Sequence, residues 1–319
     1  MRSTHTSHLY STYFAPRGRS RMYTLGMQIA QQYLSPFDKI IGVIGEPGSG
    51  KSALIKGMFP SLELTNDDDG VNIRPLPLLD QDSKMGFYTP HTYHLDIRFE
   101  MGFTNLGVLA DAILEAVHKG KRVIIEHFDL IYNMLGVNAD LLIGVGEEIL
   151  INRPNLLGPE PSEIYDIVNA SLPYRLMAHT AEDLCEYFIP HDELVRCTHG
   201  DVRHGFIMSF PGREPSFDIA ELEKKVQGMI EKNLPVSYHD EQHVSIGGEI
   251  HVCTGPRTHV RHTGQIQGFK LLHHFIYNPF DKCYLMVGCV GEKSEENLQK
   301  IDAMVKHQQQ QQQRNDFVF

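Results

Sequence analysis

The feature that most constrains the fold is a glycine-rich segment placed directly after a short apolar run. The apolar run covers residues 40–45, and such a run ending at glycine is typical of a buried parallel strand. The next residues match the pattern G-x-x-x-x-G-K-[ST] in full and read Gly45-Glu46-Pro47-Gly48-Ser49-Gly50-Lys51-Ser52. Because a helix is expected from Ala53 onward, the strand–loop–helix order predicts an α/β domain built on a parallel sheet.

Residues 45–52 have the composition that a phosphate-binding loop requires. Glycines allow successive backbone N–H groups to turn toward phosphate oxygens, and the N-terminus of the following helix adds positive potential. In such a loop Lys51 reaches the β- and γ-phosphates, and the Ser52 hydroxyl ligates Mg²⁺. We therefore expect the first domain to bind ATP, or another nucleoside triphosphate, with Mg²⁺. The alternative is a plain glycine-rich turn.

Strands and helices alternate through the first half of the chain. The expected elements are strands at residues 62–64, 123–125 and 139–143 and a helix over 104–119. A Pro/Gly-rich stretch at 153–161 then predicts a domain boundary. The predicted division is an N-terminal extension (1–22), a nucleotide-binding domain (23–157), a second domain (158–291), and a C-terminal helix with a glutamine-rich tail (292–319).

Three carboxylates in the first domain are candidates for catalysis beside Lys51. Asp68 and Asp69 belong to an acidic turn after the expected strand 62–64, and Glu126 ends the strand 123–125. The carboxyl ends of parallel strands lie beside bound phosphates, where carboxylates hold Mg²⁺ or orient an acceptor hydroxyl. The alternatives are a solvated acidic turn and an ordinary glutamate at the end of a strand.

The arrangement over about residues 38–155 resembles the small-molecule kinases of the P-loop class, particularly the uridine kinase group. The resemblance implies an acidic pair after the second strand and a carboxylate after the third. Such kinases also close a lid bearing several arginines over the phosphates, whereas the corresponding stretch here, residues 144–157, has only Arg153. Because phosphoryl transfer needs cationic stabilisation, we expect nucleotide binding and hydrolysis rather than a particular kinase reaction.

Beyond residue 161 helices mix with strands that favour an antiparallel arrangement, which predicts an α+β domain. The expected helices cover 174–188 and 218–232, and the expected strands lie near 194–210, 246–253, 266–273 and 284–290. A last helix opens at Ser294 and runs into six glutamines, residues 308–313. A low-complexity tract of this kind predicts a disordered tail.

Histidine is concentrated in the second half, where 11 of the 18 histidines lie between His179 and His274. For most of them a surface position is the expected one. Cys253 and His259 differ, because they flank a Gly-Pro turn and could direct one thiolate and one imidazole at a single ion. A pair alone is a weak metal signal, since zinc sites use three or four ligands.

The surroundings of this pair resemble the second additional domain, the editing module, of alanyl-tRNA synthetase. Residues 253–270 read C-T-G-P-R-T-H-V-R-H-T-G-Q-I-Q-G-F-K, and the family has C-G-G-T-H-V, then T-G-x-I and G-x-F-K. Residues 221–236, 194–210 and 179–184 are similar to further segments of that module. The four segments agree in order and spacing over about residues 174–290.

This resemblance implies a Zn²⁺ site that hydrolyses mischarged aminoacyl-tRNA. Carried over by position, its ligands are His179, Asp183, Cys253 and His259. Asp183 stands where the family has a second histidine, and two residues are inserted between Cys253 and His259. Carboxylate is an acceptable zinc ligand, and the i, i+4 spacing puts residues 179 and 183 on one helix face. The alternative is a domain that has lost its metal.

Composition narrows the partners and the compartment. The formal charge is −11, and residues 161–319 carry 15 basic and 22 acidic side chains, a net of −7. Both values argue against nucleic-acid binding by bulk electrostatics. Five cysteines without a C-x-x-C pair favour a reducing, cytoplasmic setting, and no apolar run is long enough to span a membrane. The first 37 residues hold four Arg and no acidic residue, which fits either a transit segment or a structured extension.

These observations lead to one hypothesis and two alternatives. The hypothesis is an ATP-binding P-loop NTPase or phosphotransferase coupled to an editing-like domain that recognises an aminoacyl-tRNA or a smaller aminoacyl-like molecule. The first alternative is a nucleoside-type kinase whose second domain serves as a substrate lid. The second is a non-enzymatic, nucleotide-gated sensor.

Overall fold

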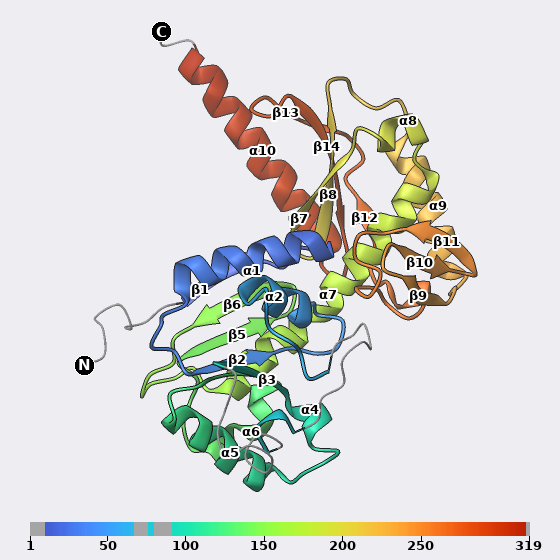
Figure 1. The fold of residues 1–319 in the computed structure, drawn as a ribbon. Coiled ribbons are helices and arrows are strands. Elements are labelled where there is room, and N and C mark those ends of the chain that lie inside the picture. Colours follow the sequence, from blue (N-terminus) through green and yellow to red (C-terminus); the bar gives the residue numbers. More distant parts are fainter. Residues whose placement is uncertain (1–9, 67–75, 80–90, 317–319) are drawn as a thin grey trace. The chain divides into compact units, whose positions relative to one another are not determined.

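The computed structural model describes residues 10–66, 76–79 and 91–316, with side chains up to residue 308. The chain forms two compact units, Met1–Leu172 and Pro173–Phe319 (Figure 1). The division falls inside helix α7 (Pro161–Phe188) and not between residues 157 and 158, where the sequence placed it. The reason is that the first half of α7 belongs to the core of the first unit, where Ile164 and Val168 are buried.

The first unit contains a mixed six-stranded sheet in the order β1-β6-β5-β2-β4-β3. Strands β3, β4, β2 and β5 are parallel, whereas β6 is antiparallel to β5 and β1 to β6. The α/β prediction is therefore confirmed at the level of a mixed α/β sheet. The strands are β1 (Tyr10–Phe14), β2 (Ile40–Ile44), β3 (Thr92–Asp96), β4 (Arg122–Glu126), β5 (Leu141–Val145) and β6 (Glu148–Asn152).

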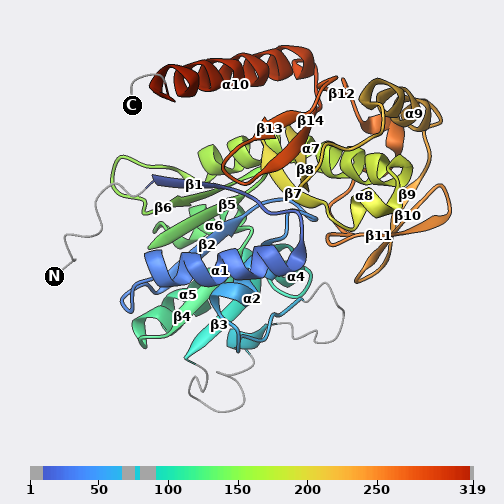
Figure 2. The same ribbon diagram turned by 90° about the horizontal axis from the view of Figure 1, so that it is seen from above.

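Helices cover both faces of this sheet (Figure 2). Helices α1 (Arg19–Tyr33) and α2 (Lys51–Met58) pack on one face, and α5 (Leu106–His118), α6 (Phe128–Leu135) and the start of α7 on the other. A short helix, α4 (Ile97–Glu100), follows β3 directly. Helices α1 and α2 meet at Gly26 and Gly57, where a Cβ would lie 2.4 Å from the Leu54 carbonyl oxygen and 2.1 Å from that of Tyr23, respectively.

Several sequence expectations for this unit need correction. Residues 62–64 are not a strand, and the strand beside β4 is instead β3. The strand expected at 139–143 begins at Leu141, because the Asp140 carboxylate accepts the N–H groups of Lys39 and Ile40. Residues 10–22 are not a separate extension, since β1 and the start of α1 belong to this unit. The predictions for 104–119 and 123–125 are confirmed by α5 and β4.

The second unit contains antiparallel sheets with helices, as an α+β reading requires. One sheet has the order β11-β10-β9, and the other β12-β14-β8-β7 with β13 beside β14. Its elements after α7 are α8 (His191–Leu194), β7 (Thr198–Val202), β8 (Gly205–Pro211), α9 (Ile219–Glu231), β9 (Val236–Asp240), β10 (His243–Ile246), β11 (Glu249–Val252), η2 (Thr263–Gln265), β12 (Lys270–Leu271), β13 (Ile276–Asn278), β14 (Cys283–Cys289) and α10 (Ser294–Asp316).

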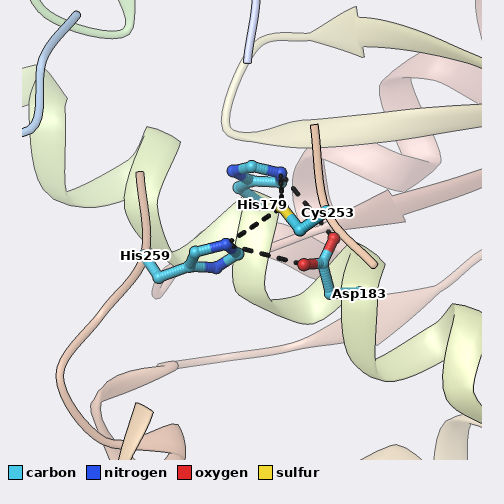
Figure 3. Close-up of side chains that lie close together, drawn as sticks. All are labelled: His179, Asp183, Cys253 and His259. Atoms are coloured by element: carbon cyan, nitrogen blue, oxygen red, sulfur yellow. Dashed lines mark hydrogen bonds and ion pairs between the residues drawn. The ribbon is translucent and has the colours of Figure 1, made fainter. Parts of the chain in front are cut away.

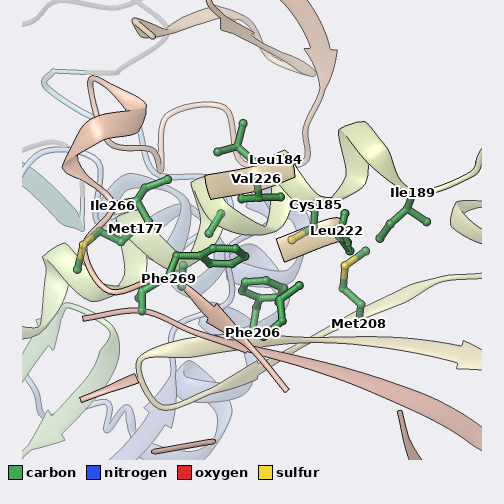
Figure 4. Close-up of a cluster of buried hydrophobic side chains, with 14 of the residues drawn as sticks. Met177, Leu184, Cys185, Ile189, Phe206, Met208, Leu222, Val226, Ile266 and Phe269 are labelled. Atoms are coloured by element: carbon green, nitrogen blue, oxygen red, sulfur yellow. The ribbon is translucent and has the colours of Figure 1, made fainter. Parts of the chain in front are cut away.

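The core of the second unit joins α7, α9 and β8 (Figure 4). Phe206 and Met208 of β8 are fully buried beside Leu222 and Val226 of α9 and Leu184 of α7. This packing fixes the rotation of α7 about its own axis. The rotation in turn decides which of its side chains face the loops that carry residues 253–260.

Two expectations for the second half are wrong. The single strand expected at 246–253 is a hairpin, because Gly247 and Gly248 have φ of 62° and 92° and turn the chain between β10 and β11. The glutamine tract is not disordered, since α10 continues through it to Asp316. Glutamine is a good helix former, and extending an existing helix avoids the cost of nucleation. Among the described residues no helix is long and apolar enough to cross a membrane.

Candidate functional sites

The glycine-rich loop, residues 45–52, connects β2 to α2 at the carboxyl edge of the parallel strands. Gly48 and Gly50 have φ of 82° and 90°, which other residues rarely adopt. At Gly45 a Cβ would lie 2.6 Å from the Val145 carbonyl oxygen. Gly48 and Gly50 are therefore required by their backbone conformation, and Gly45 by the close approach of the Val145 backbone.

A cavity of about 400 Å³ opens beside this loop. It lies at the edge where β2, β4 and β3 all end, because neighbouring parallel strands have their carboxyl ends on the same side of a sheet. Its lining combines residues of the loop after β2 with polar and charged side chains at and after the ends of β3 and β4, together with Asn66. The lining residues are Pro47, Gly48, Gly50, Lys51, Ser52, Asn66, Asp96, Arg98, Phe99, Glu126 and His127.

Lys51 and Glu126 form a buried ion pair in this cavity. Lys51 Nζ lies 3.6 Å from Glu126 Oε2 and 3.2 Å from the Glu46 carbonyl oxygen. Lys51 is 6% and Glu126 4% exposed. Burial alone would raise the pKa of Glu126, but the hydrogen bond with His94 and the charge of Lys51 lower it to about 2. Glu126 is therefore a carboxylate at neutral pH.

His94 orients that carboxylate from below the cavity. The Thr65 backbone N–H donates to His94 Nδ1 at 3.1 Å, so the ring proton lies on Nε2. That nitrogen donates to Glu126 Oε1 at 3.0 Å. His94 was not predicted from the sequence, where its only local signal is a histidine between Tyr93 and Leu95.

Asp96 is a second carboxylate at the same edge. It ends β3, lines the cavity, and accepts hydrogen bonds from Asn66 Nδ2 at 3.1 Å and from the Phe99 N–H at 3.2 Å. The sequence placed an acidic pair at Asp68 and Asp69, which lie outside the described residues. Asp96 was missed because the strand before it was not predicted. An apolar Leu95 followed by a helix-capping aspartate was the available signal.

Arg98 brings a second cation to the cavity. Arg98 Nη1 donates to Glu46 Oε2 at 2.9 Å, and its Nη2 donates to the other oxygen of the same carboxylate. The neighbouring His127 is not a third cation, because burial and the charges of Lys51 and Arg98 lower its pKa to about 4. Arg98 was not predicted, since no pattern links it to the loop.

Arg153 has a different role from the one that its position in the sequence suggested. It lies at the end of β6, where it is ion-paired with Asp38 at 2.7 Å and donates to the carbonyls of Tyr33 and Asp140. Asp38 precedes β2 and so lies at the opposite edge of the sheet from the glycine-rich loop. Residues 144–157 are largely the β5–β6 hairpin rather than a lid.

In the second unit four side chains converge to form a cluster that could hold a metal ion (Figure 3). His179 and Asp183 lie on α7, and Cys253 and His259 on the loops after β11. Their nearest ligand atoms all lie within 4.8 Å of one another. The structure thus brings together the residues that the resemblance had selected.

The spacing of these ligand atoms suits one tetrahedral ion. With bonds of about 2.0–2.3 Å, the ligand atoms of a tetrahedral zinc site lie about 3.3–3.8 Å apart. Cys253 Sγ lies 3.5 Å from His179 Nε2 and 3.3 Å from His259 Nε2. The Asp183 oxygens lie 3.7 Å and 3.5 Å from the same two nitrogens. Two nitrogens, one sulfur and one oxygen are an acceptable ligand set for zinc.

Hydrogen bonds outside the cluster prepare both imidazoles to be ligands. His179 Nδ1 donates to the Thr258 carbonyl at 2.9 Å. Thr180 donates its hydroxyl proton to the Leu176 carbonyl, so its oxygen accepts from His259 Nδ1 at 3.3 Å. Both rings therefore carry their proton on Nδ1 and present the Nε2 lone pair to the cluster.

Burial keeps His259 and the Cys253 thiol uncharged when no cation is present. It lowers the pKa of His259 to about 3. Burial, followed by the charge of Asp183, raises the pKa of the Cys253 thiol well above its ordinary value. A positive ion at the centre would reverse the effect on the thiol, because metal coordination favours the thiolate.

Comparison with known proteins identified no relative of this chain. No protein-family model matches it, and no curated protein does.

Proposed function

We propose that the first unit is a P-loop domain that binds a nucleoside triphosphate with Mg²⁺ and catalyses its hydrolysis or the transfer of its terminal phosphoryl group. The observation that carries the proposal is the convergence of Lys51, Asp96 and Glu126 on one cavity beside the glycine-rich loop. Three strand ends and a helix N-terminus meet there, which is where α/β sheets bind ligands.

Each group has a role in this proposal. The loop N–H groups and Lys51 bind the phosphates, and Ser52 and Asp96 are the groups that would hold Mg²⁺. Bound Mg²⁺ would supply charge neutralisation at the transferring phosphoryl group. Glu126, kept ionised and oriented by His94, accepts a hydrogen bond from an attacking water or acceptor hydroxyl.

The proposal is tested by MgATP binding to the Lys51→Ala variant, measured by calorimetry. Loss of this charged donor is expected to weaken binding about 10- to 100-fold. Lys56→Ala, which removes a lysine on the same helix outside the cavity lining, is the matched control and leaves the affinity unchanged. Unaltered MgATP affinity in Lys51→Ala would overturn the proposal.

Turnover separates this function from its two alternatives. An NTPase releases phosphate without an added acceptor. A nucleoside-type kinase turns over ATP only when an acceptor such as a nucleoside is present. A sensor binds MgATP tightly in both conditions and releases almost no phosphate.

For the second unit we propose a zinc-binding, editing-like domain that recognises an aminoacyl-tRNA or a smaller aminoacyl-like molecule. Support comes from the four converging ligand atoms together with the resemblance of residues 174–290 to the alanyl-tRNA synthetase module. Four protein ligands complete a tetrahedral shell, which is the arrangement of sites that retain their metal. Hydrolysis at the ion would require one ligand, such as the Asp183 carboxylate, to leave.

Zinc content and deacylation of mischarged alanine tRNA test this second proposal. We expect one zinc per chain in the wild type and less than about a tenth of that in Cys253→Ala, because loss of a ligand weakens metal sites more than the 10- to 100-fold seen for outer partners. Cys197→Ala, which removes a thiol outside the cluster, is the control and keeps its zinc. Zinc-free wild-type protein, purified without chelators, would contradict the site. If zinc-loaded protein does not deacylate the tRNA, the domain recognises its ligand without hydrolysing it.

A further inference from the structure

The glycine-rich loop carries an acidic side chain at a place where a bound triphosphate would repel it. Glu46 follows the first glycine of the loop, and its side chain forms the two hydrogen bonds with Arg98 described above. Tyr165 also donates to Glu46 Oε1 at 3.2 Å. The Arg98 side chain is 38% and the Glu46 side chain 25% exposed, so both can rearrange without opening the core.

The two cations that line the cavity are thus both engaged by carboxylates. Lys51 is paired with Glu126 in a nearly inaccessible position, while Arg98 is paired with a glutamate on the loop. The backbone of Glu46 is anchored separately, because its carbonyl oxygen accepts from Lys51 Nζ and from the Ser49 N–H. The Glu46 side chain can therefore leave Arg98 while the loop keeps its conformation.

We propose that Arg98 is a phosphate-binding residue. In the nucleotide-free protein it is ion-paired with Glu46, and when the nucleotide binds it exchanges Glu46 for the phosphates. This inference rests on the proposed nucleotide site and adds a regulated contact to it. An arginine fork binds carboxylate and phosphate in the same bidentate geometry, so the two compete for one donor set. The triphosphate carries more negative charge than Glu46, and it therefore displaces Glu46 from Arg98 when the loop binds it.

A cycle of single and double variants tests the exchange through MgATP affinity, measured by calorimetry on the full chain. Arg98→Ala is expected to weaken binding about 10-fold or more, because a charge-assisted contact is lost. Glu46→Gln is expected to tighten binding about 3- to 10-fold, since it releases Arg98 and removes a repulsive charge. The double variant is expected to bind more weakly than the wild type.

The double variant separates exchange from a permanent ion pair. If Arg98 only neutralised Glu46 and never touched the nucleotide, removing both charges would restore wild-type affinity, and that result would overturn the proposal. Glu46→Gln that binds more weakly than the wild type would also overturn it. Glu115→Gln, which breaks an exposed ion pair with Lys119 on the same unit, is the control and leaves the affinity unchanged.

The same titrations distinguish this inference from the proposed function. Wild-type protein that does not bind MgATP would contradict the nucleotide site itself. Wild-type binding that depends on Lys51, together with a double variant equal to the wild type, would contradict only the exchange. Circular dichroism of each variant confirms that any loss of affinity occurs in folded protein.

Discussion

The two candidate sites differ in the charge state of their buried ionisable groups. In the first unit the cavity lining is ionised, and each cation is paired with a carboxylate: Lys51 with Glu126 and Arg98 with Glu46. In the metal cluster of the second unit His259 and the Cys253 thiol are kept neutral by burial. Paired charges can change partners when a charged ligand arrives. A converging set of imidazole, thiol and carboxylate ligands without a cation of its own instead suits one ion that stays.

The hydrogen bonds around each site follow the same difference. His94 presents an N–H to Glu126, so it stabilises a carboxylate that already carries its charge. His179 and His259 present lone pairs, because their N–H groups are directed away from the cluster. Histidine therefore serves as an orienting donor in the first unit and as a prospective ligand in the second. In each case the hydrogen-bond partner of Nδ1 decides whether Nε2 is a donor or a ligand.

Among the variants that test this difference between the sites, Thr180→Val is expected to have the largest effect, a loss of metal affinity. The variant keeps the side-chain shape but removes the oxygen that accepts from His259 Nδ1, so the imidazole loses its fixed tautomer. Outer partners of this kind contribute about 10- to 100-fold to metal affinity, and we expect a loss in that range. Competition with a zinc chelator measures it, and MgATP affinity in the first unit should not change.

Thr258→Val is the matched control for this prediction. His179 Nδ1 bonds to the backbone carbonyl of Thr258, which the substitution leaves in place. Zinc affinity in Thr258→Val should stay within about threefold of the wild type, well short of the loss expected at Thr180. Equal losses in both variants would show that the tautomer argument is wrong and that only packing near the cluster matters.

A smaller effect is expected at Glu100, a buried carboxylate in the first unit. Within the described ranges 10–66, 76–79 and 91–316, Glu100 forms no ion pair with a lysine or arginine, whereas Glu126 is paired with Lys51. The Leu76 N–H donates to Glu100 Oε2 at 2.8 Å, and Oε1 has no hydrogen-bond partner among the described residues. Burial, helped by the charge of Asp96, raises the pKa of Glu100 from 4.5 to about 7. The folded protein therefore keeps a proton that the unfolded chain loses at lower pH.

The sign of the resulting pH dependence follows from that shift. The contribution of Glu100 to stability is fully present below about pH 4.5 and is lost as the pH rises to about 7. Glu100→Gln cannot ionise, so at pH 8 it should exceed the wild type by about 1–3 kcal/mol in free energy of unfolding and match it near pH 4.5. Urea unfolding at both pH values measures this. A destabilised Glu100→Gln at pH 8 would contradict the assignment, and Glu115→Gln serves as the exposed control.

Local sequence was sufficient where one short segment decides the structure. The apolar run at 40–45, the glycines of the loop and the apolar spacing over 104–119 each act within a short segment, and the elements they predict are present in the structure. The glutamine tract shows the limit of composition. Its low complexity suggested disorder, but its helix propensity and the preceding helix decide its conformation.

The glycine-rich loop with Lys51 and Ser52, the strand-end Glu126 and the four candidate metal ligands could all be identified without a structure. This was possible because these residues lie in contiguous motifs or match a family pattern. The fold was needed to see that Asp96 and Arg98 line the same cavity, that His94 bonds to Glu126 beside it, and that Arg153 lies at the opposite edge of the sheet. Strand order in a parallel sheet sets which chain-distant side chains become neighbours, and no local pattern encodes that order.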